Sequence, residues 1–231
     1  MKILEVKNIS KSFDNKKVVD NVSFDIVSGK IVGLLGKNGS GKTTILKMIN
    51  DLLTIDSGEI VVNGQDISDE TKKIISYLPE RSYLEQDYTV AQVFTLFEEF
   101  YKDFDMQKAI KLLEELDLDL NASLSKMSKG MKEKVQLILV MSRRAKLYIL
   151  DEPLGGVDPV TRDYIMKTIL SNFSDDASMI ITTHIVSDIE KILDEVILID
   201  KGKIVLSGNA DELRDKEKSS INDIFRRTLK C

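Results

Sequence analysis

Cysteine and histidine are almost absent from this chain, whose 231 residues contain one of each. Because Cys231 is the only cysteine, no disulfide can form within the chain, which suits a reducing compartment. Because His184 is the only histidine, the sequence argues against a metal site built on histidines. The single cysteine excludes a scaffold of disulfides within the chain. With a single histidine, any bound metal ion would need other ligands.

Two kinds of segment are missing as well. No apolar run approaches the roughly 18 to 20 residues that cross a bilayer, and charge interrupts any signal-peptide core in residues 1–7. The formal net charge is −5 with no long basic run, so a nucleic acid is not expected as a partner. With 42% hydrophobic residues, the chain can form one sizeable core.

A glycine-rich segment, Gly-Lys-Asn-Gly-Ser-Gly-Lys-Thr at 36–43, follows the apolar run 31–35 and fits G-x-x-x-x-G-K-[ST]. Glycines let backbone N–H groups close around phosphate, and the N-terminus of a helix expected over 43–52 favours the anion. Lys42 is expected to reach the β- and γ-phosphates, and the Thr43 hydroxyl to bind Mg²⁺. The predicted phosphate contacts are Gly36, Asn38, Gly39, Ser40, Gly41, Lys42, Thr43 and Thr44.

A second apolar run, 147–150, ends in the two carboxylates Asp151 and Glu152. Neighbouring side chains at a strand end point in opposite directions, so Asp151 can hold Mg²⁺ while Glu152 polarises a water. Without the phosphate loop, the pair would be interpreted as two solvated acids in a loop. Together with the phosphate loop, it predicts binding and hydrolysis of a nucleoside triphosphate.

With these segments the chain resembles a nucleotide-binding subunit of the ATP-binding cassette family, over about residues 4–206. Ser128-Lys129-Gly130 stands where that family carries its signature, usually Ser-Gly-Gly-Gln, with Lys129 in place of the first glycine. The resemblance implies that Ser128 and Gly130 contact the γ-phosphate held by another subunit. Ser128 is also a good N-cap for a helix expected over 131–143.

The same resemblance gives functional roles to His184 and Asp158, which both follow the second apolar run in the sequence. His184 follows the apolar strand 179–183, where the family has a histidine that contacts the γ-phosphate and the catalytic glutamate; without the family it would be a polar surface residue. Asp158 ends a segment similar to the family's D-loop and would help to organise the nucleotide site at a dimer interface. It can equally cap a helix that begins at Pro159, and both can hold at once.

Glu80 and Phe13 each keep two interpretations. Glu80 stands at the family's Q-loop glutamine, so the resemblance implies a ligand of Mg²⁺ or water; the alternative is a surface acid in a linker. Phe13 stands where the family stacks an aromatic ring on adenine, and the alternative is a core aromatic.

Alternation of strand and helix patterns predicts an α/β fold: a P-loop NTPase core with a mostly parallel sheet, an N-terminal antiparallel β-subdomain and an inserted α-helical subdomain. We expect one domain over 1–231, with a nucleotide-binding core (1–85 and 146–208), a helical subdomain carrying the signature (86–145) and a helical tail (209–231). The expected strands are 2–9, 22–26, 31–35, 60–63, 74–78, 147–150, 179–182, 196–199 and 204–206.

For two groups of apolar residues, the sequence leaves open whether they pack in the core or contact a partner. The first group is an aromatic cluster in the first helix of the helical subdomain, which either packs in the core or lines a groove for a helix of a membrane subunit. The second group forms a stripe on a terminal helix, for which packing on the chain's own core is preferred over a partner. The residues are Phe94, Phe97, Phe100, Tyr101 and Phe104, with Tyr83 and Leu84 nearby, and Ile221, Ile224, Phe225 and Leu229. A third pattern places Met106, Ile110, Leu113 and Leu116 on one helix face.

The resemblance implies an ATP- and Mg²⁺-dependent ATPase of the bacterial exporter-type branch. Such a subunit would pair with a second nucleotide-binding subunit and power a separate integral membrane permease from the cytoplasmic side of the cell membrane. The alternatives are a non-transport assembly ATPase of the same family and a P-loop kinase. The signature segment and His184 count against the kinase.

Overall fold

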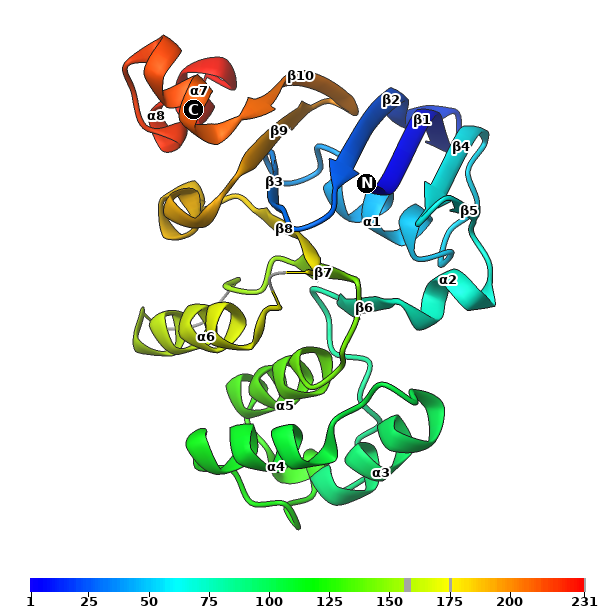
Figure 1. Ribbon diagram of the computed structural model, residues 1–231, viewed down its shortest axis with the longest axis vertical. Helices are drawn as coiled ribbons and strands as arrows, with labels where there is room; N and C mark the ends of the chain where they lie inside the picture. The colour runs from blue at the N-terminus through cyan, green and yellow to red at the C-terminus, as the bar shows by residue number, and fades with distance from the viewer. Residues whose placement is uncertain (156–158, 175, 231) are drawn as a thin grey trace.

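The computed structural model describes residues 1–155, 159–174 and 176–230 of the chain. Two β-sheets and the helices packed on them make up this part of the protein (Figure 1). Within the described residues, no helix is long and apolar enough to cross a membrane. Asp158 lies outside the described residues.

The smaller sheet is antiparallel and is formed by the N-terminal part of the chain. Its first two strands form a hairpin that turns at Asp14 and Asn15, with φ of 46° and 63°. These left-handed angles suit a two-residue hairpin turn, and they explain why both strands run longer than the sequence predicted. In sheet order the strands are β2 (Lys16–Val27), β1 (Lys2–Phe13), β4 (Ser57–Val62) and β5 (Gln65–Asp66).

The larger sheet has six strands, of which five are parallel and the edge strand β10 is antiparallel to β9. Parallel strands place their carboxyl ends at one edge of the sheet, where ligands bind in open α/β folds. The predicted α/β class with a mostly parallel sheet and an antiparallel N-terminal sheet is confirmed. In sheet order the strands are β10 (Lys203–Asn209), β9 (Glu195–Asp200), β3 (Ile31–Leu35), β8 (Ser178–Thr183), β7 (Leu147–Asp151) and β6 (Ile75–Leu78).

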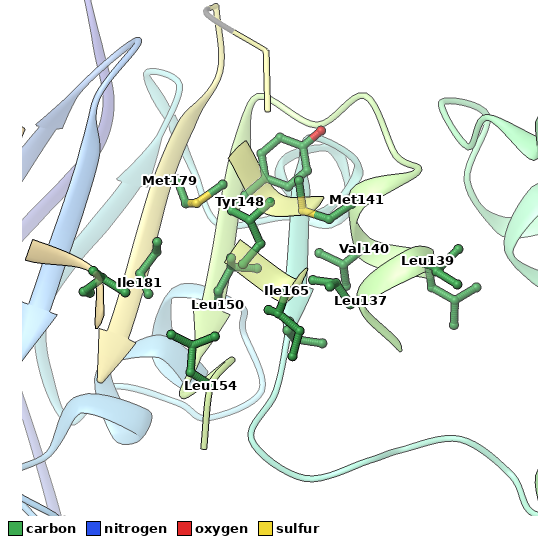
Figure 2. Packing of buried hydrophobic residues seen from close by; sticks show 14 of the residues in the cluster. Leu137, Leu139, Val140, Met141, Tyr148, Leu150, Leu154, Ile165, Met179 and Ile181 are labelled. Carbon is green, nitrogen blue, oxygen red and sulfur yellow. The ribbon is translucent and has the colours of Figure 1, made fainter. Parts of the chain in front are cut away.

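Alternating residues of the central strands face two different hydrophobic clusters. In β7, Tyr148 and Leu150 belong to a cluster shared with the helices on one face (Figure 2). Leu147 and Ile149 belong to the other cluster. This second cluster lies between the sheets and contains the buried side of α1 (Lys42–Ile49). The alternation follows from the two-residue repeat of a strand that is buried on both faces.

The helices between β6 and β7 lie together at one end of the molecule (Figure 1). They are α3 (Val90–Phe100), α4 (Met106–Glu115), the short 3₁₀ turn η1 (Leu124–Lys126) and α5 (Lys129–Met141). The remaining helices are α2 (Asp69–Lys73), α6 (Pro159–Asn172), α7 (Ala210–Glu217) and α8 (Ile221–Thr228), with 3₁₀ turns η2 (Val186–Asp188) and η3 (Glu190–Ile192).

Three details of the predicted helices are wrong. The helix expected over 43–52 ends at Ile49, because the Asn50 side chain bonds back to the Leu46 carbonyl and Asp51 is left-handed with φ of 55°. The helix expected over 131–143 begins two residues earlier, directly after its Ser128 cap, and also ends earlier. On α4, Leu113 and Leu116 are buried and Met106 packs against the same cluster, as predicted, but Ile110 does not belong to this face, which contains Ala109 and Leu112 instead.

The aromatic cluster divides between the two interpretations. Phe94 and Phe104 are buried and meet edge to face at 6.1 Å, so they belong to the core. Phe100 is 72% exposed and does not. The stripe on the C-terminal helix is buried, with Ile221, Ile224 and Phe225 in the main hydrophobic cluster, which confirms packing on the chain's own core.

Candidate functional site

The phosphate loop connects β3 to α1 at the carboxyl edge of the large sheet. Gly39 and Gly41 have φ of 76° and 108°, a region in which side chains other than glycine are strained. At Gly36 a Cβ would lie 2.5 Å from the carbonyl oxygen of Ile199 in β9. The glycines therefore allow both the turn and a close approach to the neighbouring strand.

Lys42 is the buried cation of this loop. Its Nζ donates to the Gly36 carbonyl at 2.8 Å and to the Lys37 carbonyl at 3.3 Å. The same Nζ lies 3.4 Å from Oε1 of Glu152, and both side chains are less than a tenth exposed. A buried ammonium with these neighbours is positioned to meet phosphate oxygens at the mouth of the loop.

Asp151 ends β7 and is 1% exposed. Its Oδ1 accepts the Thr182 hydroxyl at 2.6 Å, while its buried Oδ2 has no hydrogen-bond partner among the described residues. Burial raises the pKa of Asp151; the hydrogen bond from Thr182 and the nearby Thr43 hydroxyl oppose this effect, and the carboxylates of Glu80 and Glu152 add to it. A free, buried carboxylate oxygen beside the Thr43 hydroxyl is a suitable ligand for a hard cation.

Glu152 and His184 meet at the ends of adjacent strands. Nδ1 of His184 lies 2.9 Å from Oε2 of Glu152. Because an ionised carboxylate only accepts hydrogen bonds, this contact requires the imidazole to carry a proton on Nδ1. Glu152 itself has a left-handed φ of 51°, an uncommon conformation for a residue with a side chain, of the kind found at functional sites.

Thr182, which the sequence reasoning did not single out, connects the two carboxylates. Its hydroxyl donates to Oδ1 of Asp151 and accepts the backbone N–H of Glu152 at 2.9 Å. Thr182 pairs with Asp151 in the parallel register of β7 and β8. A signal was present in the sequence, since Thr182 and Thr183 are polar residues in an otherwise apolar strand directly before His184.

Most of the predicted site residues share one cavity of about 690 Å³. The phosphate loop from Asn38 to Thr44 forms one wall, and Glu152 and His184 form another. Glu80 lines this cavity and also a second one that contains Thr43 and Asp151. Residues that the sequence reasoning did not place here also line the first cavity: Val18, Arg81, Ser82, Lys129, Lys132, Glu133 and Gly155.

Besides Gly36 and Asp151, three of the predicted residues that the structure describes do not line this cavity. Ser128 caps α5, with its Oγ accepting the Met131 N–H at 3.2 Å, and Gly130 is in the first turn of that helix. Phe13 ends β1 and is 44% exposed, with the Lys11 ammonium 5.8 Å from its ring centre, so the alternative of a core aromatic is wrong. The predicted role of Phe13 requires a nucleotide, those of Ser128 and Gly130 require a second subunit as well, and all three stay predictions.

The described residues contain no group of three histidine, cysteine or acidic side chains that could hold a metal ion by themselves. Glu80, Asp151 and Glu152 therefore do not form a complete ion cage. Mg²⁺ typically binds one or two carboxylates together with substrate phosphates and water. Asp151 with Thr43 fits that type of site.

Comparison with known proteins gives a consistent result. Residues 19–155 match the ABC transporter family. The chain is 31% identical over 217 residues to the ABC transporter ATP-binding protein YtrB of Bacillus subtilis, covering 93% of this chain and 74% of YtrB. It is 32% identical over 229 residues to the lipopolysaccharide export system ATP-binding protein LptB of Haemophilus influenzae, covering 94% and 95% of the two chains.

A solved structure of an ATP-binding subunit of an ABC transporter superposes with a TM-score of 0.89 at 27% identity, covering 98% of this chain and 99% of that one. The predicted fold and family resemblance are thus confirmed by sequence and by structure. The chain belongs to the ABC transporter family, in which it is an ATP-binding subunit and an ATPase.

Proposed function

We propose that this chain hydrolyses ATP to power a separate membrane permease, and that it does so as a pair with a second nucleotide-binding subunit. The observation that carries the proposal is the chain of contacts from the buried Lys42 through the buried Glu152 to the more exposed His184. They come from the carboxyl ends of β3, β7 and β8, three neighbouring strands of the large sheet. Lys42 supplies a cation for the phosphates, Glu152 a carboxylate that can activate water, and His184 an imidazole that holds this carboxylate.

In the proposed reaction, Lys42 binds the β- and γ-phosphates of ATP. An arriving phosphate competes with Glu152 for the Lys42 ammonium, so nucleotide binding releases the carboxylate for a water molecule. Glu152 accepts a proton from that water while the oxygen of the water attacks the γ-phosphorus. The bond to the bridging oxygen breaks, and ADP and phosphate leave. His184 keeps Glu152 oriented through Nδ1.

Other residues complete the proposed site. Asp151 and Thr43, with Glu80 as a further ligand, would hold Mg²⁺, which neutralises developing charge on the phosphates. Phe13 would stack on adenine through its exposed ring. Ser128 and Gly130 would contact the nucleotide of the second subunit, and Asp158 would help to organise that interface. The division into a core (1–85 and 146–208), a helical subdomain (86–145) and a tail (209–231) is part of the same proposal.

The proposed permease contact is a cavity of about 790 Å³ between the core and the helical subdomain. Its walls include aromatic side chains from α3 and the segment after β6, of which Tyr83 is 47% exposed and Phe100 72% exposed. Exposed aromatic surface of this kind is typical of protein interaction sites. We propose that a cytoplasmic helix of the permease binds here. The export role of the relative LptB supports an export direction.

The decisive experiment uses Glu152→Gln, expressed at native level and purified with ATP and Mg²⁺ in mild detergent. Loss of the catalytic carboxylate should keep the closed pair intact, and mass spectrometry would identify what copurifies. A membrane protein with several spans supports the proposal. Recovery of soluble partners alone, with all of the protein outside the membrane fraction, overturns the transport role and indicates an assembly ATPase.

A further inference from the structure

We propose that the C-terminal helix α8 is a positioning element for His184. Through Phe225 and the backbone of Asn222, it fixes the segment 184–190 and with it the contact between His184 and Glu152. The inference rests on the proposed function, in which that contact orients the catalytic carboxylate. It assigns Phe225 as a positioning residue, which acts on the reaction through His184.

The segment that carries His184 has little regular structure of its own. After β8 ends at Thr183, the chain passes through two 3₁₀ turns, η2 and η3, of three residues each. Such turns have few internal hydrogen bonds and poorer hydrogen-bond geometry than an α-helix. The position of this segment therefore depends on the elements packed against it.

Apolar contacts join this segment to α8. Val186 is 1% exposed and Ile189 is fully buried, and both belong to the same hydrophobic cluster as Ile221, Ile224 and Phe225 of α8. Phe225, Val186 and His184 line one cavity of about 440 Å³, together with Lys37 and Asn38 of the phosphate loop. In Figure 1, α7 and α8 lie beside the segment that leads from β8 to β9. The aromatic ring of Phe225 is thus a wall of the space next to His184.

Polar contacts fix the same segment from both C-terminal helices. The Asn222 backbone N–H, in the first turn of α8, donates to Oε2 of Glu190 at 2.9 Å. A carboxylate at this end of a helix is favoured by the helix dipole. Arg214 of α7 donates to the Glu190 carbonyl. From the other side, Arg162 of α6 donates to Asp188 at 3.2 Å.

A shift of α8 is consequently transmitted over a short path. Val186 is two residues from His184, and Nδ1 of His184 lies 2.9 Å from Glu152. Displacement of catalytic groups by about 1 Å can lower a rate by about a hundredfold. The tail therefore sets the geometry of the catalytic carboxylate, although none of its described residues lines the cavity of the phosphate loop.

The test uses the full chain purified without a histidine tag. Because His184 is the only histidine, its imidazole signals in NMR spectra need no assignment. Phe225→Ala should shift or broaden these signals and lower kcat by about tenfold, with KM for ATP within about twofold. Glu190→Gln carries no ring-current change, and it should move the same signals with a smaller loss of kcat.

Phe24→Ala is the matched control, because Phe24 of β2 packs against the other hydrophobic cluster. It should lower stability while the His184 signals stay in place. If Phe225→Ala is poorly folded, Phe225→Leu takes its place. Unchanged His184 signals in the Phe225 and Glu190 variants, or an equal loss of kcat in Phe24→Ala, would overturn the inference. Failure of the underlying function is a different result: His184→Ala would then keep the wild-type kcat.

Discussion

The ammonium of Lys42 and the carboxylate of Glu152 form a buried ion pair, with 3.4 Å between Nζ and Oε1. The first residue belongs to the phosphate loop and the second follows β7. Removing one member of a buried pair leaves the other charge without compensation. Substitutions of the two residues should affect different measured quantities, because Lys42 is assigned to ATP binding and Glu152 to catalysis.

Glu152→Gln should lower the rate of ATP hydrolysis by about 10²- to 10⁴-fold, the usual contribution of a general base. ATP affinity should be kept, since Lys42 and the loop are unchanged. Phosphate release under saturating ATP measures the rate. Glu133→Gln is the control, because Glu133 lines the same cavity and pairs with Lys129 at the rim. Wild-type hydrolysis in Glu152→Gln would remove Glu152 from this role.

Lys42→Met should weaken ATP binding by at least about tenfold, because a hydrogen bond to a charged group is worth about 1.5–3 kcal/mol. Titration with a fluorescent ATP analogue measures the dissociation constant. Lys47→Met, on the exposed side of the same helix, should bind as the wild type does. Equal affinities for the two variants would contradict the position of Lys42 in the phosphate site.

Phe13→Ala should weaken ATP binding by about 1 kcal/mol, or roughly fivefold, the lower end of the range for stacking of a base on an aromatic ring. Thermal stability should change little, because the ring is 44% exposed. Phe13→Trp should restore the affinity, since it keeps an aromatic face. A Phe13→Ala variant with wild-type affinity would show that adenine is held elsewhere.

Asp151→Asn should raise the melting temperature at pH 7–8 in buffer with EDTA and without nucleotide. Burial raises the pKa of Asp151 above its ordinary value of 3.8, so the native state binds this proton more tightly than the unfolded chain does. The ionised group therefore opposes folding above its native pKa, and this penalty disappears as the pH falls towards 3.8. The asparagine still accepts the Thr182 hydroxyl.

Differential scanning fluorimetry of both proteins from pH 4 to pH 8 measures this difference. The advantage of Asp151→Asn should shrink as the pH falls. A stability difference that is constant across the range, or that grows in acid, would contradict the assigned direction of the pKa shift.

Arg143→Met should destabilise the protein by about 3 kcal/mol, as expected when one partner of a buried ion pair is removed. Its guanidinium is 3% exposed, contacts Asp103 at 3.0 Å, and lies 3.8 Å from the centre of the Tyr101 ring. The neighbouring Arg144 pairs with Asp105 but is 78% exposed. Arg144→Met should therefore cost less than about 1 kcal/mol. Urea unfolding measures both values, and similar losses would contradict the structural importance of Arg143.

The sequence was sufficient to predict every described strand except β5, the glycine-rich loop before α1 and the two carboxylates at the end of β7, because each depends on a local pattern. Contacts between distant segments were harder to predict. The hydroxyl of Thr182 meets Asp151 only through the register of β7 and β8, which no spacing along the chain reveals. Arg143, which follows α5, joins Asp103 in the α3–α4 connection and Ile75 in β6 in the same way.

Boundaries failed at short polar residues, which bond to the backbone or adopt left-handed angles. Asn50 ended α1 early, and the left-handed Asp14 and Asn15 extended the first hairpin. Phe13 was ambiguous because an aromatic residue in a strand has no pattern that distinguishes an exposed ring from a buried one. Its exposure depends on where the β1 strand ends relative to the rest of the sheet.

Thr182 occupies a position that can accept few substitutions during evolution. Its hydroxyl gives a hydrogen bond to Asp151 and receives one from the Glu152 N–H, and only an alcohol does both in so small a volume. Valine has the same shape and would leave both groups without their partner, whereas serine would keep both bonds. Among homologous chains that retain both carboxylates, this position should therefore alternate between threonine and serine and admit little else.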